Sequence, residues 1–217
     1  MKHIQTNGIS YIEPLPGVGT AWYYGISREH GDLYEAEELF LDGHPLQGNK
    51  LCLIHYPDGE VFTPLPREEG KYSDTPVFWD GSIFFLNVDF PRGVIRIFRF
   101  DCETHGADIF KEIPLASVKN CYNLMLHTAP LSLTRQGNDG LFEILWPERT
   151  SFPMDPHESF FLRDGERLFF SKWYEEGEGA QYRYWEETVV RDPEGNLLEV
   201  LPGDVRLMPD GELWHID

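Results

Sequence analysis

The sequence predicts an all-β fold, and three observations lead to this prediction. Helical periodicity is almost absent from the 217 residues. The apolar residues occur instead in short runs that Gly, Pro and Asp interrupt, and these residue types mark strand ends and turns. Aromatic residues make up 14% of the chain, a high share that favours strands. We therefore expect many short strands joined by tight turns.

The first elements predicted are two strands at the N-terminus. The stretch "KHIQTNGISYIEPLP" has an Asn7-Gly8 pair between two apolar runs, which is typical of a tight β-hairpin. The stretch "GDLYEAEELFLDG" at 31–43 has Leu33, Ala36 and Leu39 near helical spacing. It also alternates well enough for a strand, and its position in the repeat described next favours a strand.

Four segments end in nearly the same way, and they divide the chain into repeats. Each is a short apolar run that reaches Pro, and these runs lie at 10–17, 60–67, 109–116 and 197–204. Proline lacks the N–H that strand pairing requires, so it ends pairing at these points. The interval between the segments is roughly 50 residues, except for the last interval, which is nearly twice as long. We therefore expect a repeating unit that ends at each proline.

Tight turns support the same repeat. Asp-Gly pairs tolerate the positive φ of two-residue hairpin turns, and three pairs are expected between a first and a second strand: Asp80-Gly81, Asp164-Gly165 and Asp210-Gly211. A second turn is expected later in three units, near Gly59, Gly106 and Gly195. The spacing of the turns therefore predicts four short strands in each unit.

A repeat of roughly 40–50 residues with four short strands is typical of a β-propeller blade. The chain resembles the β-propeller superfamily over its whole length, although it has no Trp-Asp or kelch-type motif. We predict one domain, 1–217, with five four-stranded antiparallel blades, and a β-sandwich is the competing arrangement. The predicted blades are about 18–66, 74–115, 119–154, 157–202, and 204–217 completed by 1–16.

The fifth blade is predicted to join the two ends of the chain. Residues 204–217 supply only two strands, and the N-terminal hairpin would supply the other two. Such closure buries the faces of each blade against its neighbours and leaves no strand edge exposed.

Composition limits the classes of partner. The chain has 37 Asp and Glu against 18 Lys and Arg, a formal net charge of −19. A field of this sign repels nucleic-acid phosphates and anionic membranes, so we expect neither as a partner. The plainest interpretation of the charge is that it serves solubility. A small molecule, a glycan or a protein remains as the expected partner.

Known motifs of cofactor, metal and targeting chemistry are missing from the sequence. The chain has no GxGxxG, P-loop, GxSxG, HxH or HExxH motif, so neither a cofactor nor a metal is expected. Cys52, Cys102 and Cys121 fit no CxxC spacing and are expected to be buried free thiols. The N-terminal residues lack an apolar core of signal-peptide length, which favours a cytoplasmic location.

In propellers, one rim carries the crossings between blades and usually binds the ligand. Carboxylates accept hydrogen bonds from sugar hydroxyls, and aromatic rings cover the apolar face of a sugar. We therefore predict a non-catalytic binding or scaffold module that recognises a small molecule, glycan or peptide there. The alternative is that these residues belong to exposed loops, where Asp is common for turn formation. The residues expected to bind are Trp22, Tyr72, Asp74, Asn120, Tyr122, Asp155, His157, Glu158 and Asp204.

The stretch "MDPHESFFLRDGERLFF" at 154–170 resembles the strand opening of five-bladed glycoside hydrolases. This resemblance implies that Asp155 is a general base acting on water. An inverting enzyme needs a second carboxylate about 6.5–9.5 Å away, for which Asp74 or Asp204 is the candidate. In the family the motif usually opens the first blade, and Thr75 interrupts the same pattern after Asp74. A carbohydrate-active enzyme is therefore the alternative function.

Overall fold

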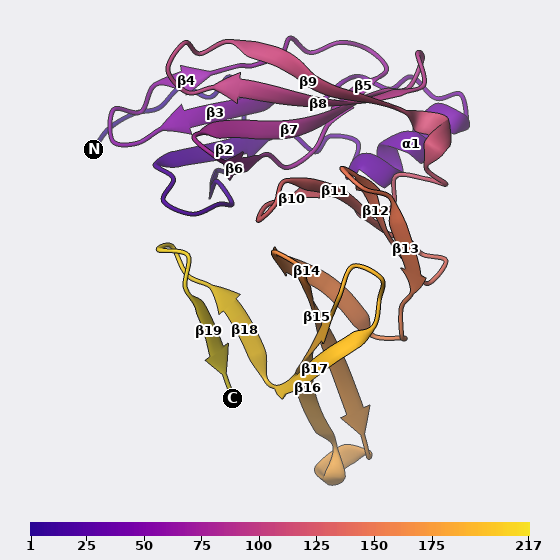
Figure 1. Ribbon diagram of the computed structural model, residues 1–217. Coiled ribbons are helices and arrows are strands. Elements are labelled where there is room, and N and C mark those ends of the chain that lie inside the picture. Colours follow the sequence, from indigo (N-terminus) through magenta and orange to yellow (C-terminus); the bar gives the residue numbers. More distant parts are fainter. The chain divides into compact units, whose positions relative to one another are not determined.

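The computed structural model describes residues 1–217 and divides them into two compact units, Met1–Leu126 and His127–Asp217. Figure 1 shows that strands dominate both units. The chain has a single α-helix, α1 (Leu33–Leu41). The all-β prediction is therefore confirmed. The helix is far shorter than a membrane span, and no helix of the chain has the length and apolarity to cross a membrane.

Unit 1 contains two antiparallel sheets. The strands of the first sheet, in the order β1-β2-β3-β4, are Glu13–Pro14, Trp22–Ile26, Leu51–His55 and Val61–Phe62. The strands of the second sheet, in the order β5-β7-β8-β9, are Lys71–Ser73, Ser82–Asp89, Val94–Asp101 and Ala107–Pro114. A short strand β6 (Val77–Trp79) also pairs with β7, and a 3-10 turn, η1 (Leu115–Ser117), follows β9.

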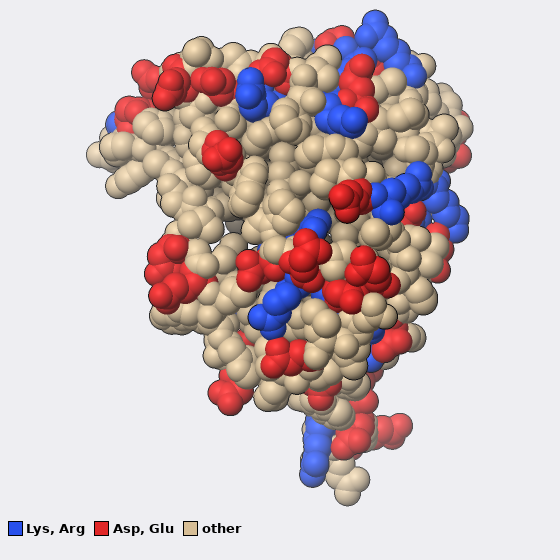
Figure 2. Space-filling model, viewed as in Figure 1, with Lys and Arg blue, Asp and Glu red and all other residues tan.

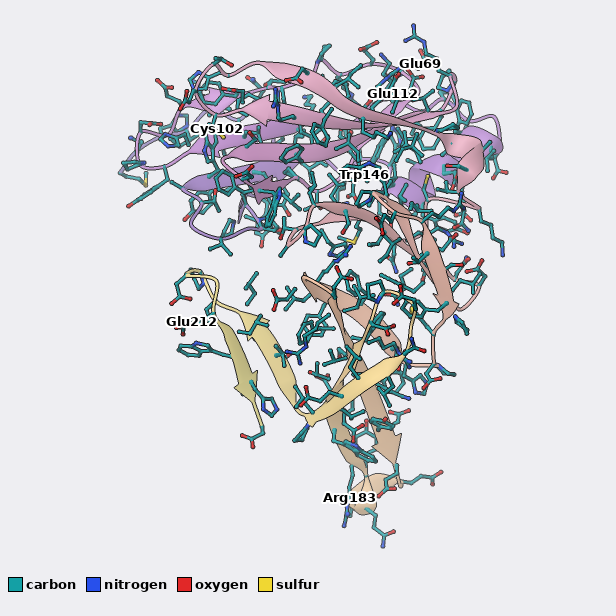
Figure 3. The ribbon with its side chains drawn as sticks, in the orientation of Figure 1. Glu69, Cys102, Glu112, Trp146, Arg183 and Glu212 are labelled. Carbon is teal, nitrogen blue, oxygen red and sulfur yellow. The ribbon has the colours of Figure 1, made fainter.

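Two further four-stranded sheets follow along the chain. The strands β10-β11-β12-β13 are Leu124–His127, Ser132–Gln136, Leu141–Trp146 and Thr150–Pro153. The strands β14-β15-β16-β17 are Glu158–Asp164, Arg167–Glu176, Arg183–Arg191 and Leu197–Pro202, and η2 (Gly179–Gln181) lies between β15 and β16. The last sheet has only β18 (Asp204–Leu207) and β19 (Leu213–Ile216). In Figure 3, Arg183 lies near the tip of the long β15–β16 hairpin.

Four of these sheets have the form of propeller blades, because neighbouring strands are antiparallel and follow one another along the chain, apart from the step from β5 to β7 in the second sheet. The resemblance to the β-propeller superfamily is confirmed at this level. The sheets β10–β13 and β14–β17 lie within the predicted blades 119–154 and 157–202. The strands β9 and β17 are the last of their sheets and end at Pro114 and Pro202, as predicted, whereas β4 ends at Phe62, four residues before Pro66.

The predicted fifth blade is wrong. The strand β1 pairs with β2, where Glu13 opposes Tyr24 and Pro14 opposes Tyr23, so the N-terminal strand completes the first sheet. The pair β18–β19 remains a two-stranded sheet. Asn7 and Gly8 do form the expected turn, with positive φ at both residues. The segment after the turn packs on the first sheet, where Ile9 contacts the buried Cys52 and Ile54. The count of blade-like sheets is therefore four.

The strand expected at 31–43 is also wrong, because this stretch forms α1. Asp32 caps the helix: its Oδ1 accepts a hydrogen bond from the backbone N–H of Glu35 at 2.9 Å. The Glu35 carboxylate accepts in return from the backbone N–H of Asp32, also at 2.9 Å. This reciprocal arrangement is a capping box, and it satisfies donors that a helix start leaves free. The residues that showed helical spacing, Leu33 and Ala36, are buried.

Most of the predicted turns are present. Asp80 and Gly81 both have positive φ and join β6 to β7 in a two-residue loop, as the Asp-Gly pair predicts. The turn expected at Asp164-Gly165 lies one residue later, because Asp164 pairs with Arg167 across the hairpin. The three cysteines form no disulfide, as expected; Cys52 and Cys121 are buried, whereas Cys102 is partly exposed.

Apolar side chains fill the space between sheets in each unit. In unit 1 the two sheets meet in a core that includes Trp22, Leu53 and Phe85. In unit 2 the β14–β17 sheet is covered on both faces. Leu168 and Phe170 of β15 pack toward β12 and β13, whereas the intervening Phe169 packs with Val205 of β18. The alternation of a strand thus sends successive side chains into two different cores.

Substitution of Phe170 by alanine should destabilise the protein strongly. The Phe170 ring is fully buried among other aromatic rings, so its removal leaves a cavity, and we expect a loss of about 3–5 kcal/mol in the free energy of unfolding. Urea denaturation of the full chain measures this loss. Leu198→Ala on β17 is the matched control, because Leu198 is 54% exposed and should change stability by less than about 0.5 kcal/mol. Equal losses in the two variants would contradict the packing of this sheet.

Candidate functional site

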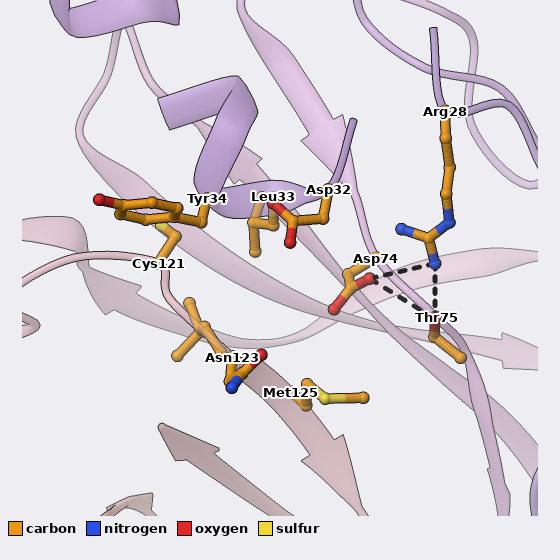
Figure 4. Close-up of a pocket in the computed structure, with 10 residues that line it drawn as sticks. Arg28, Asp32, Leu33, Tyr34, Asp74, Thr75, Cys121, Asn123 and Met125 are labelled. Atoms are coloured by element: carbon orange, nitrogen blue, oxygen red, sulfur yellow. Dashed lines mark hydrogen bonds and ion pairs between the residues drawn. The ribbon is translucent and has the colours of Figure 1, made fainter. Parts of the chain in front are cut away.

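A cavity of about 160 Å³ lies in unit 1, where three segments distant in sequence come together (Figure 4). Four lining residues come from the end of β2 and the start of α1, two directly follow β5, and the others precede or begin β10. The lining residues are Arg28, Asp32, Leu33, Tyr34, Asp74, Thr75, Cys121, Asn123, Leu124 and Met125. Charged, polar and apolar groups therefore face one small space.

Asp74 is held at the cavity by the strand that precedes it. The side-chain amide of Asn49, which is itself buried, donates to the carbonyl of Ser73 at 2.7 Å and accepts from the N–H of Ser73 at 2.8 Å. The side chain of Asn87 donates to the Ser73 hydroxyl at 3.0 Å. The backbone N–H of Asp74 donates to the carbonyl of Leu86 at 3.2 Å. These bonds fix the backbone from which the Asp74 carboxylate projects.

The Asp74 carboxylate is buried and only weakly paired. The residue is 8% exposed, and burial raises the pKa of its carboxyl above the ordinary range, with the negative charge of Asp32 adding to the rise. Hydrogen bonding from Thr75 and the charge of Arg28 lower the pKa in part. The backbone N–H of Thr75 bonds to the carboxylate, whereas its side-chain contacts are long: 3.5 Å to the Thr75 hydroxyl and 4.0 Å to Nη2 of Arg28. Asp74 therefore retains capacity to accept hydrogen bonds from a ligand.

The start of α1 supplies a second carboxylate to the cavity. Figure 4 shows the side chains of Asp32 and Asp74 pointing toward the same space. Asp32 is placed there by its role as the helix cap. The positive end of the helix dipole favours the negative charge of Asp32 at this position.

Donors and apolar groups complete the lining. The Arg28 guanidinium donates to the Thr75 hydroxyl at 3.3 Å and has exposed surface left for other acceptors. The side chain of Asn123 points into the cavity in Figure 4. The ring of Tyr34 meets that of Tyr122 edge-on, with centroids 5.1 Å apart. Together with Met125, Tyr34 offers an apolar wall, so the site suits a small molecule that has both hydroxyl groups and an apolar face.

The residues of unit 1 that the sequence predicted to bind a ligand lie in different places in the structure. Asp74 lines the cavity, and Tyr122 supports it through Tyr34. Trp22 is 6% exposed and lies in the core against His55. Tyr72 is 1% exposed, and its hydroxyl donates to the carbonyl of Gly31 at 2.8 Å. Burial raises the pKa of Tyr72 to about 12. Trp22 and Tyr72 therefore serve packing, and neither presents a ring to a ligand.

Asn120 has a local role in the turn that leads to β10. Its side-chain Oδ1 accepts a hydrogen bond from the backbone N–H of Tyr122 at 3.3 Å. This bond shapes the turn that carries Tyr122, Asn123 and the start of β10 past the cavity.

In unit 2, Asp155 and Glu158 form ion pairs with Lys172 and Arg191. Nζ of Lys172 donates to Oδ2 of Asp155 at 2.8 Å, and Nη2 of Arg191 lies 3.8 Å from the same oxygen. Nη2 of Arg191 also donates to Oε1 of Glu158 at 2.8 Å, and the Glu158 side chain is fully buried. The hydrogen bond and charge of Lys172 lower the pKa of Asp155. Both carboxylates are therefore already engaged in ion pairs, although the Asp155 side chain is 57% exposed.

The remaining predicted residues, His157 and Asp204, also contact other side chains of unit 2. The His157 ring stacks on Trp173 with centroids 3.9 Å apart. Oδ2 of Asp204 accepts from Nε of Arg206 at 2.7 Å on the same strand, β18. Neither residue lines the cavity in unit 1.

Sequence reasoning missed Arg28, Asp32, Tyr34 and Asn123, which line the cavity. The spacing of Asp32 and Glu35 is a signal that could have placed Asp32 and Tyr34, because Asp-x-x-Glu before an apolar run marks a helix start. Nowhere along the chain do three or more His, Cys, Asp or Glu side chains gather in a group that could hold a metal ion.

No protein-family model matches the sequence, and no curated protein matches it either. Among solved structures, the chain is similar to a putative 6-phosphogluconolactonase from Bacteroides uniformis, with 11% sequence identity and a TM-score of 0.38. The similarity covers 94% of this chain and 76% of that chain. A likeness at this level gives no basis for assigning an activity.

Asn49→Ala should loosen the support of Asp74. The substitution removes both hydrogen bonds to the Ser73 backbone and leaves buried groups unpaired, so we expect a loss of about 1–3 kcal/mol in the free energy of unfolding. Urea denaturation measures the loss. Asn196→Ala is the control, because Asn196 is exposed and bonds only within its own turn to Asp192. A similar loss in both variants would argue against a special role for Asn49.

Asp74→Asn should stabilise the free protein at neutral pH. Because the folded-state pKa of Asp74 is raised, the folded state binds this proton more tightly than the unfolded state does. Its ionisation therefore favours unfolding once the pH exceeds the ordinary Asp pKa of about 3.9, and the penalty is complete above the raised pKa.

The Asn variant should exceed the wild type in melting temperature at pH 7, and the difference should shrink as the pH falls toward 4. Thermal unfolding followed by circular dichroism over this range measures the difference. A variant that melts below the wild type at pH 7 would show that the ionised carboxylate is stabilising.

Proposed function

We propose that the chain is a non-catalytic binding module that takes a small polyhydroxy molecule of the sugar class in the cavity beside Asp74. The observation that carries this proposal is the burial of the Asp74 carboxylate with only long side-chain contacts. A buried charge with few hydrogen bonds is costly, and hydroxyl groups of a ligand would add hydrogen bonds to those that Thr75 supplies.

The rest of the lining supports the same class of ligand. Asp32 and Asp74 accept hydrogen bonds, whereas Arg28 and the Asn123 amide can donate them, so hydroxyl groups could bond on several sides. Tyr34 and Met125 supply apolar surface against which the C–H face of a sugar could pack. Nucleic acid and membranes remain unexpected as partners, since the net charge is −19 and acidic side chains are scattered over the face that Figure 2 shows.

The glycoside hydrolase alternative has less support. It requires Asp155 to accept a proton from water, and a good base needs a pKa near the working pH. The ion pair of Asp155 with Lys172 lowers the pKa of Asp155 and weakens it as a base. Glu158, the nearest carboxylate along the chain, is bound to Arg191.

Binding of monosaccharides tests the proposal. Isothermal titration of the wild-type chain against a panel of glucose, galactose, mannose, xylose and arabinose should show at least one ligand with millimolar or tighter affinity. Asp74→Asn should weaken that affinity at least 10-fold, because a charged acceptor becomes a neutral amide. Asp204→Asn on β18 is the control and should leave the affinity unchanged.

The outcome that contradicts the proposal is equally clear. If no member of the panel binds the wild type, or if Asp74→Asn binds as tightly as the wild type, the cavity does not have the proposed function. A loss of binding in this variant does not reflect unfolding, since its stability is expected to be retained or raised.

A further inference from the structure

A second cavity in unit 1 shares Arg28 with the first. It measures about 180 Å³ and is lined by Tyr11, Glu13, Tyr24, Gly25, Ile26 and Arg28. The first cavity measures about 160 Å³. Pockets for small ligands usually measure about 300–1,000 Å³, so each cavity alone is small for a complete ligand. The two taken together reach the lower end of this range.

A chain of polar side chains connects the two cavities. The Tyr24 hydroxyl donates to Oε2 of Glu13 at 2.6 Å in the second cavity and also interacts with the Thr75 hydroxyl. Thr75 belongs to the lining of the first cavity and accepts from Nη2 of Arg28 at 3.3 Å. The same Nη2 lies 4.0 Å from Oδ1 of Asp74. The Arg28 guanidinium thus faces both spaces, with a carboxylate in each of them.

The second cavity exists because the N-terminal segment lies very close to β2. Gly25 has no side chain at the point of contact, and a Cβ there would meet Cγ2 of Ile9 at 2.7 Å and the carbonyl oxygen of Tyr11 at 3.1 Å. The close approach brings Tyr11 to the rim of the cavity. Its side chain is 71% exposed, so the ring is accessible to a ligand. Burial and the neighbouring Glu13 raise the pKa of Tyr24 to about 12, so its hydroxyl keeps its proton at physiological pH.

We infer that the two cavities are subsites of one binding site, which takes a linear saccharide of at least two units with Arg28 between them. The inference rests on the proposed function and specifies the size of the saccharide that binds. Asp74 and Asp32 accept hydroxyl hydrogen bonds from one sugar unit, and Glu13 accepts them from the next. Arg28 donates to oxygens near the linkage, and the exposed Tyr11 ring covers the second unit.

Titration with matched mono- and disaccharides tests this inference. The probes are the monosaccharide that binds best in the panel above and disaccharides of that sugar with several linkages. The wild type should bind one disaccharide at least 10-fold more tightly than the monosaccharide. Tyr11→Ala and Glu13→Gln should each reduce this advantage to less than about 3-fold while leaving the affinity for the monosaccharide unchanged. Tyr56→Ala is the control, since Tyr56 is also exposed in unit 1 but lines neither cavity.

Each outcome decides between the two statements. If a monosaccharide binds in a manner that depends on Asp74 but no disaccharide binds more tightly, the inference is wrong and the proposed function stands. If the advantage of the disaccharide persists in both Tyr11→Ala and Glu13→Gln, the second cavity is not the second subsite. If no saccharide binds the wild type, both the proposed function and the inference are wrong. Tyr11→Ala changes an exposed side chain, so loss of folding does not confuse the result.

Discussion

The structure depends on the burial of both faces of its central strands. In β15, the consecutive residues Leu168, Phe169 and Phe170 are all buried, although neighbouring side chains of a strand point to opposite faces. The same holds in β7, where the run from Ile83 to Leu86 is buried throughout. A sheet with two apolar faces needs a packed layer on each side. This requirement explains the unbroken apolar runs of the sequence and leaves the polar site residues to segments at strand ends.

One wrong assignment accounts for most of the difference between the predicted and the observed fold. Residues 31–43 were assigned to a strand, which filled the first blade with four strands from 18–66. The N-terminal residues were then free to complete a fifth blade with 204–217. Because α1 is a helix, the first sheet lacks one strand, and β1 supplies it by pairing with β2. The prolines that end β9 and β17 and the Asp80-Gly81 turn were predicted correctly, because both signals depend on local backbone geometry.

The candidate site was harder to predict than the sheets. Asp74 was predicted because it lies in the crossing between the first two predicted blades, and it lines the cavity. Trp22 and Tyr72 were expected to bind a ligand and are buried. Aromatic residues suit both a core and a sugar-binding surface, and only their neighbours in the fold distinguish the two. Asp155 is paired with Lys172 and Arg191, which are distant from it in sequence, and no local sequence pattern predicts such an ion pair. Arg28, Asp32 and Tyr34 were missed because their convergence depends on the helix.

The same constraint links stability to function at Asp74. Hydrogen bonds from Asn49 to Ser73 hold the strand end in place, and they keep the following carboxylate in a buried position that opposes its ionisation. A residue of this kind weakens the free protein, and proteins retain such residues mainly where they are needed for function. A ligand that bonds to the carboxylate offsets the cost only in the folded state, so binding must stabilise the fold by mass action. The packed cores therefore have to offset the cost of a buried acid that Thr75 and Arg28 compensate only in part.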